Sequence, residues 1–293
     1  MPRTFLPDRG VVRVTGEDAR SFLDGIVTSA VADLAPGTAR WAALLTPQGK
    51  ILFDFLVLAV PEGDGGGYLL DAPRALTHDL VKRLAFYKLR AKVIIADESE
   101  ALAVAALWGD ETAAPGQVYE DPRLTALGRR AIGPRAEIEA FGEAALADYH
   151  AMRIAAGVPE GGKDFTYGEA FPHEVLMDQL GGVSFDKGCY VGQEVVSRMQ
   201  HRGTARTRIV PVVFTGGFVP EDGAAVVAGE KTLGHVGSCA RGRGLAMLRL
   251  DRVADALAAG LTPTAGGLAL TLEKPGFATF AFPGESAPDP ARG

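Results

Sequence analysis

The residues best suited to chemistry lie in one short stretch, Lys187-Gly-Cys-Tyr-Val-Gly-Gln-Glu194. It places a single thiol, Cys189, close to a lysine and between two glycines, which allow the backbone to approach a ligand closely. A neighbouring cation can lower the pKa of a thiol and raise its reactivity. The pattern therefore allows a reactive thiol at Cys189 tuned by Lys187, although for a lone cysteine the residues by themselves favour a small buried filler. The role of Lys187 also stays open, since a lysine can equally cap a turn.

A second candidate is Asp54, which lies inside the almost continuously apolar run Ile51–Val60. Burying an unpaired carboxylate is costly, so an acid at this position indicates a polar partner or a ligand, unless Asp54 faces outward at a strand edge. Other familiar motifs fail. The glycine-rich runs miss the dinucleotide-binding pattern, and the pair His173-Glu174 is followed by Met177 where a zinc-binding helix needs a second histidine. We expect no metal site.

The composition limits the partners that this chain can have. Its 293 residues include 30 basic and 36 acidic side chains, a net charge of −6, which makes nucleic-acid binding unlikely. Its two cysteines are too few to hold an iron–sulfur cluster alone, because such a cluster usually takes about four thiolates. No secretory signal is recognised at the start, and no apolar run reaches the ~20 residues of a membrane-spanning helix. We expect a cytoplasmic protein without direct membrane contact.

The elements that must position these residues follow from the apolar patterns. Short strands are expected near residues 11–14, 40–46 and 51–60, and an amphipathic helix follows from Leu76. One long helix is expected over Ala136–Ala156. From Arg208 onward, short β-rich runs are separated by glycine and proline, as in a small β-barrel. The sequence thus predicts the α+β class with a C-terminal barrel.

The stretch 187–194 also closely resembles the K-G-C-Y-x-G-Q-E signature of the YgfZ-type folate-binding proteins, which act in iron–sulfur cluster maturation. These proteins are similar to the glycine-cleavage T-protein (aminomethyltransferase) superfamily. The resemblance covers nearly the whole chain. Leu45–Asp54 looks like the turn and strand of that superfamily, Arg153–Asp164 resembles its pattern R-x-x-x-G followed by G-x-D, and Pro172-His-Glu174 resembles its P-x-E.

The resemblance implies an aminomethyltransferase-like fold with three lobes around a central folate pocket. Two lobes would be α+β and ferredoxin-like, and the third would be the C-terminal β-barrel. The first lobe would be discontinuous, formed by residues 1–46 and 146–205, and the second would be formed by residues 47–145. The barrel would span residues 206–285, with a tail at 286–293.

The resemblance also implies which residues would bind tetrahydrofolate or a folate derivative. Glu174 matches the carboxylate that would pair with the pteridine ring, since a carboxylate accepts two hydrogen bonds from an aminopyrimidinone edge. Asp54 matches the pocket aspartate at the reactive end of the folate. Asp71 falls where T-proteins carry a pocket asparagine. Arg202 is favoured, among the arginines that surround it, for the glutamate tail of the folate.

Three functional hypotheses follow. The first is a folate-binding factor for assembly or repair of [4Fe–4S] clusters on client enzymes, in which scaffold or carrier proteins supply most cluster ligands and Cys189 acts in redox or thiol chemistry. The second is a tetrahydrofolate-dependent aminomethyltransferase, which the 187–194 stretch and Asp71 disfavour. The third is a non-catalytic adaptor that docks partners through residues 187–194. In each, Cys239 is expected in the barrel core.

Overall fold

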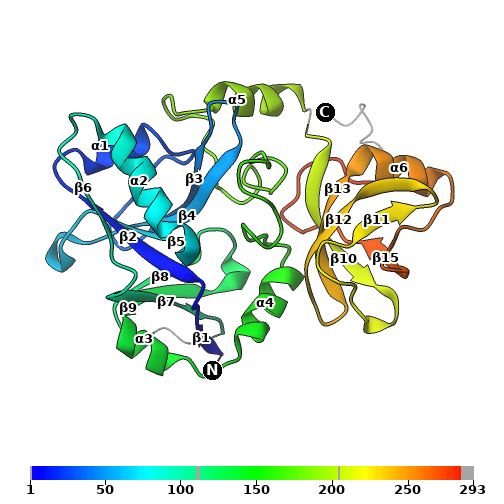
Figure 1. Cartoon of the computed structure of the whole chain (residues 1–293), viewed down its shortest axis with the longest axis horizontal. Helices are drawn as coiled ribbons and strands as arrows, with labels where there is room; N and C mark the ends of the chain where they lie inside the picture. The colour runs from blue at the N-terminus through cyan, green and yellow to red at the C-terminus, as the bar shows by residue number, and fades with distance from the viewer. Residues whose placement is uncertain (1, 110–112, 204, 285–293) are drawn as a thin grey trace, which may run out of the picture.

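A five-stranded antiparallel sheet forms the N-terminal part of the protein in the computed structural model (Figure 1). Its strand order is β3-β4-β5-β2-β6. Helices α1 (Ala19–Asp24) and α2 (Thr77–Lys88) contribute Leu23 and Leu80 to the hydrophobic cluster on one face of this sheet. The structure describes residues 2–109, 113–203 and 205–284. The five strands are β2 (Arg9–Thr15), β3 (Ala39–Leu45), β4 (Ile51–Ala59), β5 (Tyr68–Pro73) and β6 (Ile94–Asp97).

Strand β4 is apolar along almost its whole length because both of its faces are buried. Phe55 and Val57 belong to the cluster under α1 and α2, whereas Leu56 and Leu58 belong to a second cluster on the opposite face. Successive side chains of a strand alternate between faces. Asp54 therefore shares the face of Leu56 and Leu58, which is turned towards the middle of the molecule.

A second antiparallel sheet has the order β1-β7-β9-β8. Helix α3 (Arg135–Phe141) packs against this sheet through Ile138, and α4 (Leu146–Ala155) continues towards the C-terminal strands (Figure 1). The two sheets and their helices confirm the predicted α+β class. The four strands are β1 (Arg3–Phe5), β7 (Leu102–Leu107), β8 (Gln117–Glu120) and β9 (Arg129–Pro134).

The single helix expected over residues 136–156 is wrong, because the structure breaks it into α3 and α4. At the break, the amide groups of Glu143 and Ala144 donate hydrogen bonds to the carbonyl of Arg3 in strand β1. A Cβ on Gly142 would lie 2.8 Å from the backbone nitrogen of Phe5, so only glycine fits beside this strand. Pairing with β1 thus replaces the helical hydrogen bonds at this point.

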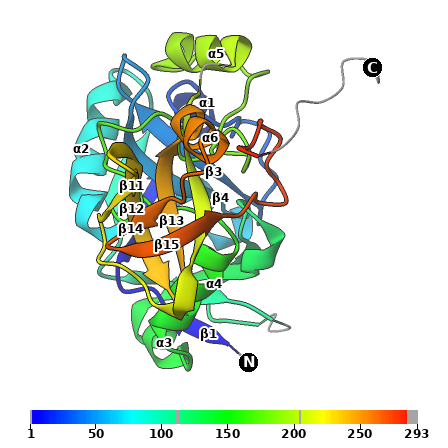
Figure 2. The same ribbon diagram turned by 90° about the vertical axis from the view of Figure 1, so that its right-hand side faces the viewer.

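The predicted C-terminal barrel is confirmed as a closed barrel of six strands in the order β10-β13-β12-β11-β14-β15. It lies to one side of the two sheets and faces the viewer in Figure 2. Helix α6 (Leu250–Ala258), which the sequence patterns did not predict, contributes Val253 to the core of the barrel. The strands are β10 (Thr207–Phe214), β11 (Ala225–Ala228), β12 (Lys231–Ala240), β13 (Arg243–Arg249), β14 (Thr264–Ala265) and β15 (Leu268–Leu272).

Strand pairing bears on the division into lobes. The boundary expected after residue 46 falls between β3 and β4, which are hydrogen-bonded neighbours, with Ala43 opposite Asp54. A boundary there would split one sheet. We propose instead that the lobes follow the sheets, with residues 9–97 in one lobe and β1 with residues 102–155 in the other. The barrel begins at Thr207, next to the expected boundary at 206, and the expected tail at 286–293 lies outside the described residues.

Residues 156–192, which we call the central segment, connect α4 to α5 (Gln193–Arg202) without a regular helix or strand. In Figure 1 much of this segment runs between the sheets and the barrel. It is anchored on β4, where the amide of Gly168 bonds the carbonyl of Ile51 and the amide of Ile51 bonds the carbonyl of Ala170. A long irregular segment held by rigid elements is a common place for functional side chains.

Candidate functional site

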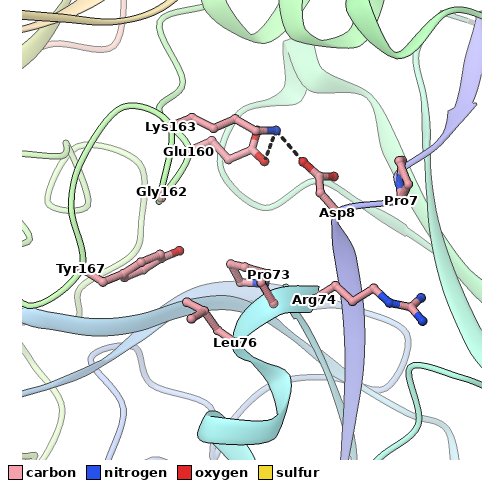
Figure 3. Close-up of a pocket in the computed structure, with 11 residues that line it drawn as sticks. Pro7, Asp8, Pro73, Arg74, Leu76, Glu160, Gly162, Lys163 and Tyr167 are labelled. Carbon is pink, nitrogen blue, oxygen red and sulfur yellow. Dashed lines mark hydrogen bonds and ion pairs between the residues drawn. The ribbon is translucent and has the colours of Figure 1, made fainter. Parts of the chain in front are cut away.

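A cavity of about 690 Å³ opens between the central segment, the β1–β2 turn and the start of α2 (Figure 3). Its apolar wall is formed by prolines, leucine and an aromatic ring, and its polar side carries charges of both signs. The volume lies within the usual range for small-molecule sites. The lining residues are Pro7, Asp8, Pro73, Arg74, Ala75, Leu76, Glu160, Gly161, Gly162, Lys163 and Tyr167.

An ion-pair cluster ties the central segment to the β1–β2 turn across this cavity (Figure 3). The Lys163 ammonium donates to Asp8 Oδ2 at 2.5 Å and to Glu160 Oε1 at 3.1 Å. Burial of Glu160 raises the pKa of its carboxyl, but Arg153 at 3.0 Å and Lys163 outweigh burial and leave that pKa well below its usual range. Glu160 is therefore ionised, and the cluster keeps this side of the cavity charged.

Asp54 lies behind one wall of the cavity and is 6% exposed. Its Oδ2 accepts a hydrogen bond from Trp41 Nε1 at 2.8 Å, and its Oδ1 accepts one from the Tyr167 hydroxyl at 2.5 Å. Burial, followed by the charge of Asp54, raises the pKa of Tyr167 far above its ordinary value, so the phenol stays protonated and donates. Tyr167 lines the cavity and thus links it to the buried carboxylate.

Our sequence reading missed Trp41 and Tyr167 as the partners of Asp54. For Trp41 a signal existed, because Ala43 pairs with Asp54 and a residue two positions along the same strand shares its face. Tyr167 lies in the irregular central segment, where no periodicity in the sequence indicates which way a side chain points. Its position requires glycine opposite it, since a Cβ on Gly161 would lie 2.0 Å from the Tyr167 hydroxyl oxygen and 2.8 Å from Asp54 Oδ1.

Glu174 is half-buried and is not among the residues that line the cavity. Its Oε2 accepts a hydrogen bond from the Phe171 amide at 2.9 Å, and its backbone carbonyl accepts one from the Ile209 amide in the barrel at 2.7 Å. Burial raises the pKa of Glu174, an effect that the Phe171 amide and Lys50 reduce without cancelling. Its second oxygen makes no hydrogen bond within the described part of the chain and is free to accept one.

The structure places Asp71 in a buried ionic network between the two sheets, with a side chain that is 0% exposed. Arg9 Nε donates to Asp71 Oδ1 and Arg130 Nη1 donates to Oδ2, both at 2.6 Å, and the Tyr119 hydroxyl adds a contact at 3.3 Å. Burial raises the pKa of Asp71, but the two arginines outweigh it and the pKa is lowered. Both carboxylate oxygens are already engaged. We therefore propose a structural role for Asp71 in place of the expected folate contact.

The pattern at Arg153–Asp164 also has a structural role. Arg153, 1% exposed, donates to Asp164 Oδ2 and to the Ser238 hydroxyl of β12, both at 2.7 Å. The Ser238 amide in turn donates to Asp164 Oδ1 at 2.7 Å. These bonds join α4, the central segment and the barrel. The pattern thus fixes the barrel beside the lobe that carries the cavity.

Lys187 is anchored away from solvent, with a side chain that is 2% exposed. Its ammonium donates to the backbone carbonyls of Asp24, Val27 and Ser29 at 2.5, 2.9 and 2.9 Å. Burial lowers the pKa of Lys187, and the nearby Asp24 carboxylate partly offsets this effect. Because the three N–H donors are used on these carbonyls, we propose the capping alternative for Lys187. Lys187 fixes the loop after α1 to the loop that carries the thiol.

Cys189 is exposed, whereas the residues that flank it are held in place. Tyr190 is 7% exposed, and burial raises its pKa to about 12. Gly192 adopts a φ of 82°, and a Cβ there would lie 2.5 Å from the Thr46 carbonyl oxygen. The stretch 187–194 is therefore a fixed support that presents one thiol to solvent. The expected core position of Cys239 agrees with its half-buried place in the barrel, where burial raises its pKa to about 12.

Arg202 is the last residue of α5 and is exposed. Its side chain makes no ion pair or hydrogen bond with any residue in the described ranges. By contrast, Arg208 is buried, paired with Asp178 at 2.9 Å and stacked on Phe280 with its guanidinium carbon 4.3 Å from the ring centroid. Of these two arginines, only Arg202 is free to meet a ligand. It does not line the cavity.

The comparisons with known proteins agree with this architecture. Residues 8–115 match the GCVT N-terminal domain, and residues 206–280 match the CAF17 C-terminal beta-barrel domain. The crystal structure of the glycine cleavage system aminomethyltransferase T from Bartonella henselae is similar with a TM-score of 0.72 and 17% identity, covering 96% of this chain and 87% of that one. This likeness shows the aminomethyltransferase-like fold that the sequence predicted.

Curated relatives are more similar in sequence. The mitochondrial iron–sulfur cluster assembly factor IBA57 of Homo sapiens is 34% identical over 279 residues, which cover 85% of this chain and 77% of the human protein. The IBA57 homologues of Mycosarcoma maydis and Coccidioides immitis are 36% and 35% identical, and the aligned regions span 56% and 55% of their length. The expected cytoplasmic location is contradicted, because these relatives are named as mitochondrial proteins. No helix among the described residues is long and apolar enough to span a membrane. The chain belongs to the family of the IBA57 iron–sulfur cluster assembly factors.

Proposed function

We propose that this protein is an assembly or repair factor for [4Fe–4S] clusters, of the YgfZ type, and that Cys189 is the group it offers to a partner. The observation that carries the proposal is the form of the stretch 187–194. Lys187 and Tyr190 are buried on either side of an exposed thiol. A thiolate is the usual ligand of iron–sulfur clusters and also attacks disulfides, so a thiol held outward suits transient exchange with a protein that carries the cluster.

The division of labour with partners follows from ligand number. A cluster takes about four thiolates, and this chain has two cysteines, of which Cys239 is half-buried in the barrel. Scaffold or carrier proteins and client enzymes would therefore supply most of the ligands. Cys189 would contribute one thiolate ligand for a short time, or would attack a partner disulfide to form a mixed disulfide and release the second partner sulfur as a thiolate, which then attacks the mixed disulfide to free Cys189 again.

The test is the activity of [4Fe–4S] enzymes in cells that lack their own copy of this factor. We expect the wild-type chain and the matched control Cys239→Ser to restore these activities. We expect Cys189→Ser to fail although the protein accumulates normally. Full restoration by Cys189→Ser would contradict the role of the thiol and would favour an adaptor that acts by docking alone.

We further propose that the cavity beside Tyr167 takes part in binding tetrahydrofolate. Its volume suits a ligand of this size, and its apolar wall of Pro73, Leu76 and Tyr167 suits a flat ring system. Lys163 at its polar side would meet a carboxylate of the glutamate tail in exchange for its pairing with Asp8. Asp54, through its bond to Tyr167, would hold that ring in position. Bound folate would supply one-carbon or redox chemistry.

Calorimetric titration with tetrahydrofolate tests this second proposal. We expect binding to wild type and to Cys189→Ala, and a loss of at least about tenfold in affinity for Lys163→Ala. We expect a similar loss for Glu174→Ala only if the free oxygen of Glu174 meets the pteridine, so this variant distinguishes the two possible ring sites. Absence of binding to the folded wild-type protein would exclude a folate-dependent function and leave the thiol proposal in place.

A further inference from the structure

The segment from Leu80 to Ala96, which covers most of α2 and the start of β6, has an unusual charge pattern. It contains five cationic side chains and no aspartate or glutamate, in a chain whose net charge is −6. Lys82 approaches Asp79 only at 3.7 Å, while Lys92 pairs with Glu17 at 2.7 Å. The five cations are Lys82, Arg83, Lys88, Arg90 and Lys92.

Three of these cations have no ion-pair partner among the described residues. Arg83, Lys88 and Arg90 make no ion pair with any residue in the part of the chain that the structure describes. Like charges held together repel one another, and the repulsion is relieved when an oppositely charged surface docks. The segment is therefore electrostatically complementary to an acidic surface.

The same segment exposes large apolar side chains. Phe86 is 72% exposed, Leu89 is 89% exposed and Ile94 is 68% exposed. Leu89 also has a φ of 45°, a conformation that non-glycine residues seldom adopt, and it lies just past the end of α2. Ile94 lies on the face of β6 opposite to α2, because its neighbour Ile95 packs into the cluster under α2. Single exposed apolar residues are ordinary, but Phe86 and Leu89 lie three positions apart among unpaired cations at the end of α2, which indicates an interaction surface there.

Helix α1 connects this surface to the loop that carries Cys189. The backbone amide of Lys92 bonds the carboxylate of Asp18, which precedes α1, while the ammonium of Lys187 bonds the carbonyl of Asp24 at the other end of the helix. The six residues of α1 span about 9 Å at 1.5 Å per residue. The helix itself adds the exposed cation Arg20 between the two.

We propose that the surface formed by Phe86, Leu89 and the five cations docks an acidic partner protein and holds it beside Cys189. The docking of an acidic protein rests on exposure and charge alone. The placement of that protein beside Cys189 rests on the proposed function. A protein is favoured over an anionic membrane because the neighbouring thiol needs a partner that brings thiolates. Aromatic and aliphatic side chains would anchor the centre, and the cations would steer the approach.

The experiment places the photoreactive residue p-benzoylphenylalanine at position 89 of the full-length chain in cells, identifies the cross-linked protein and then purifies it. Its affinity for the chain is measured by fluorescence anisotropy at low and moderate salt. The variant Leu89→Glu is compared with Leu257→Glu, which changes an exposed leucine of α6 in the barrel. Tetrahydrofolate binding and restoration of [4Fe–4S] enzymes are measured on the same variants.

The proposal expects an acidic partner whose affinity falls at least about tenfold with added salt and with Leu89→Glu, but not with Leu257→Glu. Equal affinity of the Leu89→Glu variant overturns it, as does a partner without net negative charge. Stable association with vesicles of phosphatidylcholine and phosphatidylglycerol, lost in Leu89→Glu, would assign the surface to membranes instead and also overturns it. If docking follows these expectations while Cys189→Ser still restores the enzymes, the surface stands and the proposed function fails.

Discussion

Buried polar side chains surround both Asp71 and Cys189, but they enclose the carboxylate of Asp71 and leave the thiol of Cys189 exposed. At Asp71, two arginines from two sheets close on one carboxylate, and every charged group in the contact is buried. In the stretch 187–194, the side chains of Lys187 and Tyr190 are buried, whereas Cys189 is exposed. The difference shows that charged residues such as Asp71 and Lys187 can stabilise the fold, whereas the exposed Cys189, held by buried neighbours, is the residue placed to react.

The largest effect is expected from breaking the Asp71 contact. Asp71→Asn removes the ion-pair partner of buried Arg9 and leaves buried Arg130 with Asp121 alone, and it should cost about 3–5 kcal/mol of unfolding free energy, measured by urea titration. The matched control Asp33→Asn changes an exposed ion pair with Arg40 and should cost about 0–1 kcal/mol. Equal stabilities of the two variants would contradict the structural role of Asp71.

The same contact predicts a dependence of stability on pH. The folded pKa of Asp71 is lower than its ordinary value of 3.8, so Asp71 contributes stability above that pH. The contribution is lost as pH falls through the lowered, folded pKa. Acid unfolding of wild type should therefore show a stability loss that Asp71→Asn lacks.

A smaller effect is expected from loosening the support of the thiol. Lys187→Met leaves three backbone carbonyls without their donor and should cost about 1–3 kcal/mol. It should also speed limited proteolysis within residues 185–192. Lys231→Met, at an exposed barrel position, is the control. Unchanged proteolysis of the Lys187 variant would show that the loop is held by other contacts.

The bond between Tyr167 and Asp54 should matter less for stability. Tyr167→Phe removes one of two donors to a buried carboxylate and should cost about 1–2 kcal/mol, against almost nothing for the control Tyr87→Phe. If the cavity binds tetrahydrofolate as proposed, calorimetry should also show weaker binding to the Tyr167 variant. Unchanged stability and unchanged binding would show that Asp54 does not act on the cavity through Tyr167.

The smallest effect is a pH dependence of folate binding at Glu174. Burial raises the pKa of this carboxyl above 4.5, so the ionised form is lost at a higher pH than for an ordinary glutamate. If Glu174 is the ring site, pairing with the pteridine requires its carboxylate, and affinity should fall as pH is lowered through the raised pKa. Calorimetry over a pH series should give a flat profile for Glu174→Gln, and the same slope in both proteins would place the titrating group elsewhere.

The elements predicted best from the sequence are those whose pattern depends on burial. The run Ile51–Val60 and the short barrel strands after Arg208 were confirmed because their apolar residues fill cores on known faces. The long helix over Ala136–Ala156 was wrong, since β1 at the far N-terminus supplies the hydrogen bonds that break it. Local periodicity carries no information about such a distant strand.

In the candidate site, too, some residues could be predicted from the sequence and others could not. Asp54 could be singled out because an acid in an apolar strand needs partners, and the structure supplies Trp41 and Tyr167. The burial of Asp71 between two sheets could not be foreseen, because Arg130 lies 59 positions away. The role of Lys187 depended on where the loop after α1 lies, which neither spacing nor composition fixes.

The most direct test of the presented thiol is native-state labelling of the two cysteines with a thiol-specific reagent, followed by mass spectrometry. Cys189 is exposed, and Cys239 is half-buried with a pKa raised to about 12. The account predicts that Cys189 is modified quickly in the folded protein and that Cys239 is modified only slowly until the chain unfolds. Slow labelling of Cys189, or equal rates at the two positions, would contradict the conclusion that residues 187–194 hold a thiol out for a partner.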